Sequence, residues 1–253
     1  MSRRLLTVLL VPAALGAAVP ATAGSQVLVR APERALPRVV ADPSGLAVET
    51  ARGPVRLAPV PGTRVESIVE LGDGWWVAGS RPDGDGRELV LLAERGRGVE
   101  ELPPPPARVA NRSRPVPVVA RGAIEGLLWL EGDEETRHAV LWSAWNGGGF
   151  DPPSVVSPPG PGSQLALAAV TLEDGRVLAV WAGFDGEDDE IWASLLGRQG
   201  WSAPTRVGEA NHVPDILPTV TPTPGGGARV AWCHFDGSEY RVATARLDGD
   251  RFV

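Results

Sequence analysis

A repeat of about 51 residues constrains the fold of this chain more than any other feature. One column of the repeat is the residue that follows a glycine-containing turn, and its members are 51 positions apart: Val99, Phe150, Trp201 and Phe252. A second column contains Trp129, Trp181 and Trp232, spaced by 52 and 51 positions. A period of this size with several short strands per unit is typical of a β-propeller blade, which stacks its faces on its neighbours.

Each repeat unit is predicted to contain four strands bounded by turn residues. In the unit over residues 164–211, the apolar runs LALAAVTL and VLAVWAG are followed by the acidic turn FDGEDDE, the run IWASLL, the turn GRQG and the outer run WSAPTRV. Nearly continuous apolar runs are expected of strands that are buried on both faces. The same pattern predicts further blades over residues 64–106, 115–159 and 216–253.

The segment over residues 24–62 contains shorter strand-like runs separated by proline and glycine, and we interpret it as a degenerate first blade. The predicted fold class is therefore an all-β propeller of about five four-stranded blades. In the alternative, an N-terminal strand completes the last blade, whose outer run stops at Val253, and the ring has four blades. No window after residue 23 has the apolar spacing of a long helix.

The first 23 residues have the pattern of a secretory signal peptide. Arg3 and Arg4 precede an apolar run from Leu5 to Val19, and small residues lead to a predicted cleavage site after Ala23. An uncleaved membrane anchor is the alternative, but this run is shorter than the ~20 residues that a spanning helix needs. We therefore expect residues 24–253 to form a single exported domain of a bacterial protein, secreted or periplasmic.

Charge and cysteine content limit the partners. The net charge of -7 argues against a nucleic-acid partner, because binding to phosphates requires clustered positive charge. Cys233 is the only cysteine, so the chain has no internal disulfide. We interpret Cys233 as a small buried apolar residue. No apolar run after residue 23 could span a membrane, so we expect no membrane contact once the signal is cleaved. We also expect the protein to be a monomer.

The turns SAWNGGGF and SLLGRQGW resemble the Asp-box of the sialidase-like propellers, in which a Ser, an Asp, a Gly and an aromatic residue close this turn. Trp145 and Leu196 stand where the box has Asp, so the repeats are degenerate. The positions that retain the spacing are Ser143, Gly147, Phe150, Ser194 and Trp201. The resemblance implies the propeller fold. Sialidases of that family bind the substrate carboxylate through arginines and use a tyrosine as the nucleophile. The arginine motif is missing here, and Tyr240, the only tyrosine, is expected away from the central funnel.

The predicted function is a non-catalytic binding or scaffolding module for a glycan or a protein. The alternative is a sialidase-like glycoside hydrolase, but sugar hydrolysis needs two carboxylates near each other, and the predicted inner strands offer only Glu66 and Glu70 in one blade. We assign no catalytic residue. If a glycan binds by stacking on aromatic rings, the candidate residues are Trp145, Trp142, Trp192 and Trp75.

Acidic residues recur in the turn between the second and third strand of each blade. The densest of these turns contains five candidate metal ligands: Asp185, Glu187, Asp188, Asp189 and Glu190. Carboxylate oxygens are the ligands that Ca²⁺ prefers, so a third possibility is a propeller with a structural Ca²⁺ site on its acidic rim. The competing interpretation is a set of solvated turns in which Asp-Gly satisfies the hairpin geometry, with no cofactor.

Overall fold

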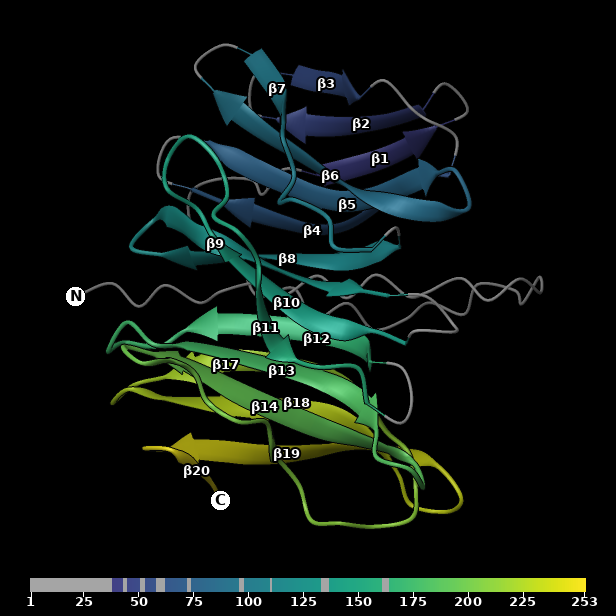
Figure 1. Ribbon diagram of the computed structural model, residues 1–253, viewed down its shortest axis with the longest axis vertical. Helices are drawn as coiled ribbons and strands as arrows, with labels where there is room; N and C mark the ends of the chain where they lie inside the picture. The colour runs from purple at the N-terminus through teal and green to yellow at the C-terminus, as the bar shows by residue number, and fades with distance from the viewer. Residues whose placement is uncertain are drawn as a thin grey trace. The chain divides into compact units, whose positions relative to one another are not determined.

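The computed structural model describes residues 38–42, 45–50, 53–57, 62–71, 74–95, 98–109, 111–132, 137–160 and 164–253. The predicted signal peptide and its cleavage site lie outside these residues. All regular elements in the described part of the chain are β-strands, as predicted (Figure 1). In these residues there is no helix with the length and apolar character that a membrane crossing requires. The chain divides into two compact units between Leu57 and Ala58.

The first unit contains one antiparallel sheet of three strands in the order β1-β2-β3. Its strands are β1 (Arg38–Asp42), β2 (Gly45–Thr50) and β3 (Gly53–Leu57). The segment interpreted as a degenerate first blade thus forms a sheet of its own. Among the described strands, the last sheet of the chain pairs with none of these three. An N-terminal strand before residue 38, which the four-blade alternative allows, lies outside the described residues.

The second unit contains four antiparallel sheets, each made from one repeat unit (Figure 1). The first comprises β4 (Arg64–Glu70), β5 (Trp75–Asp83), β6 (Gly86–Arg95) and β7 (Gly98–Leu102). The second comprises β8 (Arg112–Ala120), β9 (Ala123–Glu131), β10 (Ala139–Ala144) and β11 (Ser154–Ser157).

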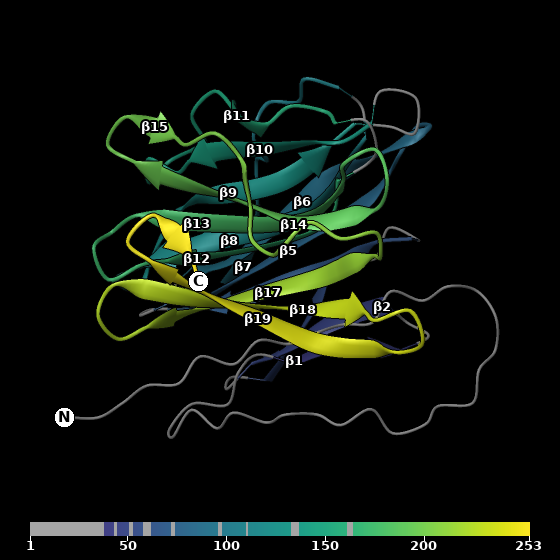
Figure 2. The ribbon, with the colours of Figure 1, turned by 90° about the horizontal axis from the view of Figure 1, so that it is seen from below.

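The third and fourth sheets follow the same order of strands. The third comprises β12 (Gln164–Thr171), β13 (Val177–Phe184), β14 (Asp189–Gly197), β15 (Gly200–Trp201) and β16 (Thr205–Arg206), the last two both pairing with β14. The fourth comprises β17 (Asp215–Thr223), β18 (Gly227–Phe235), β19 (Tyr240–Asp248) and β20 (Arg251–Phe252). The first strand of each sheet contacts the first strand of the next, so β4, β8, β12 and β17 are the innermost strands; Figure 2 shows β12 beside β17.

Three apolar cores lie between successive sheets of the second unit. Because side chains alternate across a strand, one strand supplies two cores. On β9, Leu127 and Trp129 join the core shared with the preceding sheet, and Leu128 and Leu130 join the core shared with the next one. The middle strands are apolar on both faces for this reason, as their sequences predicted.

The tryptophan column of the repeat has the same role in each sheet. Trp129, Trp181 and Trp232 are all buried, and each packs in the core between its own sheet and the preceding one. The period of about 51 residues therefore arises from equivalent packing positions on β9, β13 and β18.

Candidate functional site

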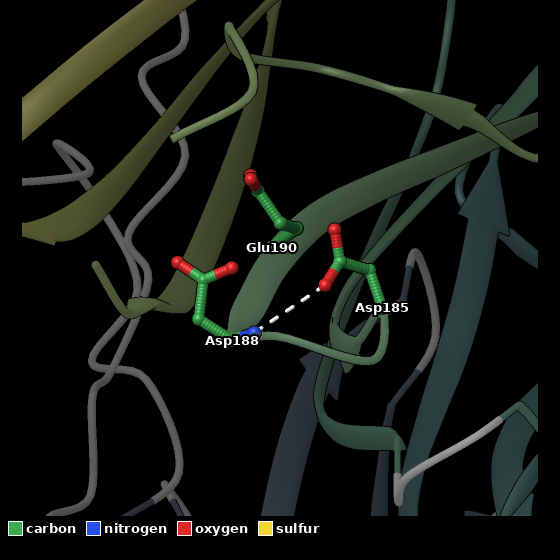
Figure 3. A group of neighbouring side chains, drawn as sticks. All are labelled: Asp185, Asp188 and Glu190. Atoms are coloured by element: carbon green, nitrogen blue, oxygen red, sulfur yellow. Dashed lines mark hydrogen bonds between the residues drawn. The ribbon is translucent and has the colours of Figure 1, made fainter. Parts of the chain in front are cut away.

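Three carboxylates gather at the turn between β13 and β14. One oxygen from each of Asp185, Asp188 and Glu190 lies within 4.8 Å of the others. Figure 3 shows the three groups pointing to the same side of the turn. All three belong to the five candidate metal ligands predicted from the sequence.

Asp185 shapes the turn itself. Its Oδ1 accepts the backbone N–H of Glu187 at 2.9 Å and that of Asp188 at 3.3 Å. The N–H of Glu187 is the main cause that lowers the pKa of Asp185. Asp236, 51 residues later, does the same in the turn between β18 and β19, and the backbone N–H of Glu239 and the contacts of Ser238 lower its pKa to about 2. Asp at the first turn position is therefore a structural element of the repeat.

Asp188 and Glu190 are buried, which the turn does not require. Asp188 is 8% exposed and Glu190 is fully buried. Neither oxygen of Asp188 has a hydrogen-bond partner among the described residues, and the same is true of Oε2 of Glu190. Burial raises the pKa of both carboxyl groups; the charge of Asp185 adds to the rise for Asp188. Buried carboxylate oxygens without partners are costly, so these atoms are available for a ligand.

Arg206 supplies the positive charge closest to the cluster. It comes from β16, which pairs with β14, and it donates to Glu190 Oε1 at 2.9 Å and to Asp185 Oδ2 at 2.8 Å. Its guanidinium also lies over the ring of Trp192, 5.5 Å from the ring centre. The backbone N–H of Asn211, in the connector to β17, lies 3.3 Å from Glu190 Oε1. Arg206 thus holds Asp185 and Glu190 and leaves Asp188 unpaired.

A third buried acid faces the cluster from the next sheet. Asp215, at the start of β17, raises the pKa of Asp188 and Glu190 through its charge. Its Oδ1 lies 2.6 Å from Nδ1 of His234, and its Oδ2 lies 3.4 Å from the side-chain amide of Asn211. Sequence reasoning missed the contact between Asp215 and His234, because it forms only when β17 and β18 pair across the sheet.

The other two predicted metal ligands lie apart from the group of three. Glu187 is exposed and pairs with His212, which is also exposed. Asp189 is half-buried, and burial raises its pKa. Its sequence neighbours Asp188 and Glu190 lie on the opposite face, because side chains alternate from residue to residue at the start of β14.

The four tryptophans proposed for sugar stacking lie within the packed sheets. Trp75 and Trp142 are buried, 4% and 7% exposed. Trp145 packs edge-on against Trp76, with the ring centres 5.1 Å apart, and Trp192 donates from Nε1 to the carbonyl of Gly183 at 3.2 Å. Each ring therefore has a packing role in this structure.

The residues behind the Asp-box resemblance close their turns in the same way. Ser143 donates to the carbonyl of Asp151, and Ser194 donates to that of Ser202 at 2.7 Å, in each case the residue after the aromatic position. The aromatic residues themselves pack inward: Trp201 meets Trp142 edge-on with ring centres 5.8 Å apart. These turns stabilise the outer edge of the blades.

A second candidate site lies where the innermost strands begin. All four strands break their pairing near the third residue, and the residues at this position are Glu66, Arg114, Ala166 and Leu217. Arg114 and Leu217 have φ of 55°, in the left-handed region that non-glycine residues rarely adopt. Bulges of this kind re-aim side chains and are frequent next to functional sites.

The bulges carry both polar and apolar side chains. Leu217 is 48% exposed. Leu165, which precedes Ala166 in the bulge of β12, is 45% exposed. Burial raises the pKa of Glu66, while the charge and backbone N–H of Arg114 oppose the rise. Glu66 also accepts from Ser80 at 3.3 Å. Among the described residues at the four bulges, Glu66 is the only carboxylate.

Comparisons with known proteins identify the fold. No protein-family model matches the sequence, and no curated protein matches it either. Solved structures do match. A thermostable family-43 glycoside hydrolase aligns at 10% identity over 85% of this chain and 90% of its own, with a TM-score of 0.53. The endo-arabinase of Bacteroides thetaiotaomicron aligns at 11% identity over 87% and 97% of the two chains, with a TM-score of 0.52.

A third match is the NanB sialidase of Streptococcus pneumoniae, at 12% identity and a TM-score of 0.52, over 82% of this chain and 36% of that one. At such identities the likeness concerns the fold alone. It confirms the predicted all-β propeller and its similarity to the propellers of glycoside hydrolases.

Proposed function

We propose that this chain is an exported β-propeller that binds a glycan without hydrolysing it, at the bulges where the innermost strands begin. The observation that carries the proposal is the recurrence of a bulge on four successive innermost strands. It exposes Leu165 on β12 and Leu217 on β17, and it brings Glu66 on β4 under the charge and backbone N–H of Arg114 on β8. Sites for small ligands combine apolar surface with a few oriented polar groups in this way. Export rests on the N-terminal signal pattern, which lies outside the described residues.

The strained backbone at Arg114 and Leu217 supports a ligand-binding role. A left-handed conformation at a non-glycine residue costs of order 1–3 kcal/mol, and such strain clusters at binding sites. The glycoside hydrolases with the same fold act on glycans, which favours this class of ligand over a protein. A single carboxylate among the described bulges favours binding over hydrolysis, because glycosidases generally need two.

A glycan array, followed by calorimetry on the best ligand, tests the proposal. Arg114→Ala and Leu217→Ser are expected to weaken binding at least tenfold. Arg121→Ala is the matched control, because Arg121 is also exposed, also has a positive φ of 51°, and lies at the opposite end of β8. Binding to none of the arrayed glycans, or equal loss in the Arg121 variant, would overturn the proposal.

Fluorogenic sialosides and arabinofuranosides separate binding from hydrolysis. We expect no release of the fluorophore above the rate without protein. Turnover that disappears in Glu66→Gln would instead support the hydrolase alternative.

A further inference from the structure

The chain contains a second turn with which the acidic turn can be compared directly. The turn from Asp185 to Glu190 and the turn from Asp236 to Arg241 occupy equivalent places in successive sheets, 51 residues apart. Both begin with an Asp that accepts two backbone N–H groups. The later turn forms with Glu239 and Arg241 in place of Asp188 and Glu190, and their side chains are 65% and 64% exposed. Two buried carboxylates are therefore not needed to build the turn.

The charges at the first turn do not balance. Asp185, Asp188 and Glu190 offer three carboxylates, and Arg206 is the only guanidinium that pairs with them in the described structure. Ionised, the group has an excess of two negative charges. Asp215 does not offset it, since its charge faces His234 and adds to the repulsion. Charges taken out of water without a partner are strongly unfavourable, so this arrangement favours a bound divalent cation.

We infer that Asp185, Asp188 and Glu190 bind a divalent cation, Ca²⁺, between β14 and the connector that leads to β17. The ligand geometry is suitable, because two oxygens that both lie about 2.4 Å from one Ca²⁺ are at most about 4.8 Å apart. The three carboxylates meet that limit. The unpartnered oxygens of Asp188 and Oε2 of Glu190 are the atoms free to coordinate.

The chemistry of the ligands selects the ion. A set made only of carboxylate oxygens suits hard cations and lacks the nitrogen and sulfur ligands typical of Zn²⁺ and Cu²⁺. Mg²⁺ demands near-ideal octahedral geometry and keeps its waters, whereas Ca²⁺ accepts irregular oxygen sets. The ion would tie the acidic turn to the connector, which already contacts Glu190 through the N–H of Asn211. The ligands of this site differ from the residues of the proposed glycan site, and neither argument depends on the other.

The test is a titration of the full chain, freed of metal with EGTA, with Ca²⁺ and separately with Mg²⁺. Calorimetry measures binding, and Trp fluorescence measures the melting temperature. We expect one Ca²⁺ per chain and a rise in Tm of about 5 °C at saturating Ca²⁺, because a ligand of the folded state stabilises it. Mg²⁺ is expected to produce a smaller rise.

Two variants and one control locate the site. Asp188→Asn and Glu190→Gln are expected to lose the Ca²⁺-dependent rise, and Asp188→Asn should be at least as stable as the parent in EGTA because it removes an unpaired buried charge. Glu239→Gln, at the equivalent exposed position of the later turn, should keep the full rise. The inference is overturned if 10 mM Ca²⁺ neither binds nor shifts Tm, or if the rise survives in both site variants.

Discussion

Nη1 of Arg206 lies 2.9 Å from Oε1 of Glu190, whose side chain is fully buried. Arg206 therefore compensates a charge that water cannot reach. We expect Arg206→Met to lower the free energy of unfolding in EGTA by about 2–3 kcal/mol, because it leaves the Glu190 carboxylate unpaired. Urea denaturation followed by Trp fluorescence measures the change.

A double variant shows whether this loss comes from the stranded charge. Glu190→Gln in the Arg206→Met background should recover most of the stability, since the pair is then replaced by uncharged groups. If the double variant is as unstable as Arg206→Met, the loss arises from the other contacts of Arg206, those with Asp185 and with Trp192.

The sequence predicted the fold better than the site, for a physical reason. Strand alternation and the spacing of Trp129, Trp181 and Trp232 are local and periodic, so the predicted second strand over residues 177–183 matches β13 to within one residue. The acidic density at residues 185–190 was also visible. Which of those carboxylates are buried was not, because Glu190 meets Arg206 of β16 and the N–H of Asn211 only once the chain has returned past β14.

The tryptophans illustrate the same limit. An exposed stacking platform and a buried packing residue look alike in sequence, and only the neighbouring sheet decides between them. Trp145 lies 4.8 Å from Phe150 and 5.1 Å from Trp76, centre to centre. We expect Trp145→Ala to cost about 3 kcal/mol of stability, measured by urea denaturation. A variant of unchanged stability that loses glycan binding would instead support the stacking role.

The pKa of Glu66 makes a prediction about pH. Burial raises this pKa, so ionisation favours the unfolded chain. The penalty is absent below the ordinary Glu pKa of about 4.3 and grows as the pH rises from there to the pKa of the folded state. Glu66→Gln should therefore gain stability relative to the parent between pH 4 and pH 8.

Urea denaturation of both proteins at pH 4, 6 and 8 measures this difference. Glu70→Gln, at the other end of β4, controls for the loss of one negative charge. A stability difference between Glu66→Gln and the parent that does not change with pH would show that burial does not control the ionisation of Glu66.

The bulge that carries Glu66 depends on a glycine in the adjacent strand. Gly79 pairs with Val65 on β4, and a Cβ at Gly79 would lie 2.0 Å from the carbonyl oxygen of Arg64. We expect Gly79→Ala to destabilise the protein by about 3 kcal/mol, because backbone rather than a flexible side chain must move. It should also weaken glycan binding, since the bulge on β4 shifts with Arg64.

Gly197→Ala is the matched control: its Cβ would meet nothing within 4 Å, so the stability of this variant should be unchanged or slightly higher. Equal stability of the two variants, measured by thermal melts, would show that the close approach of β4 to β5 does not restrain the bulge.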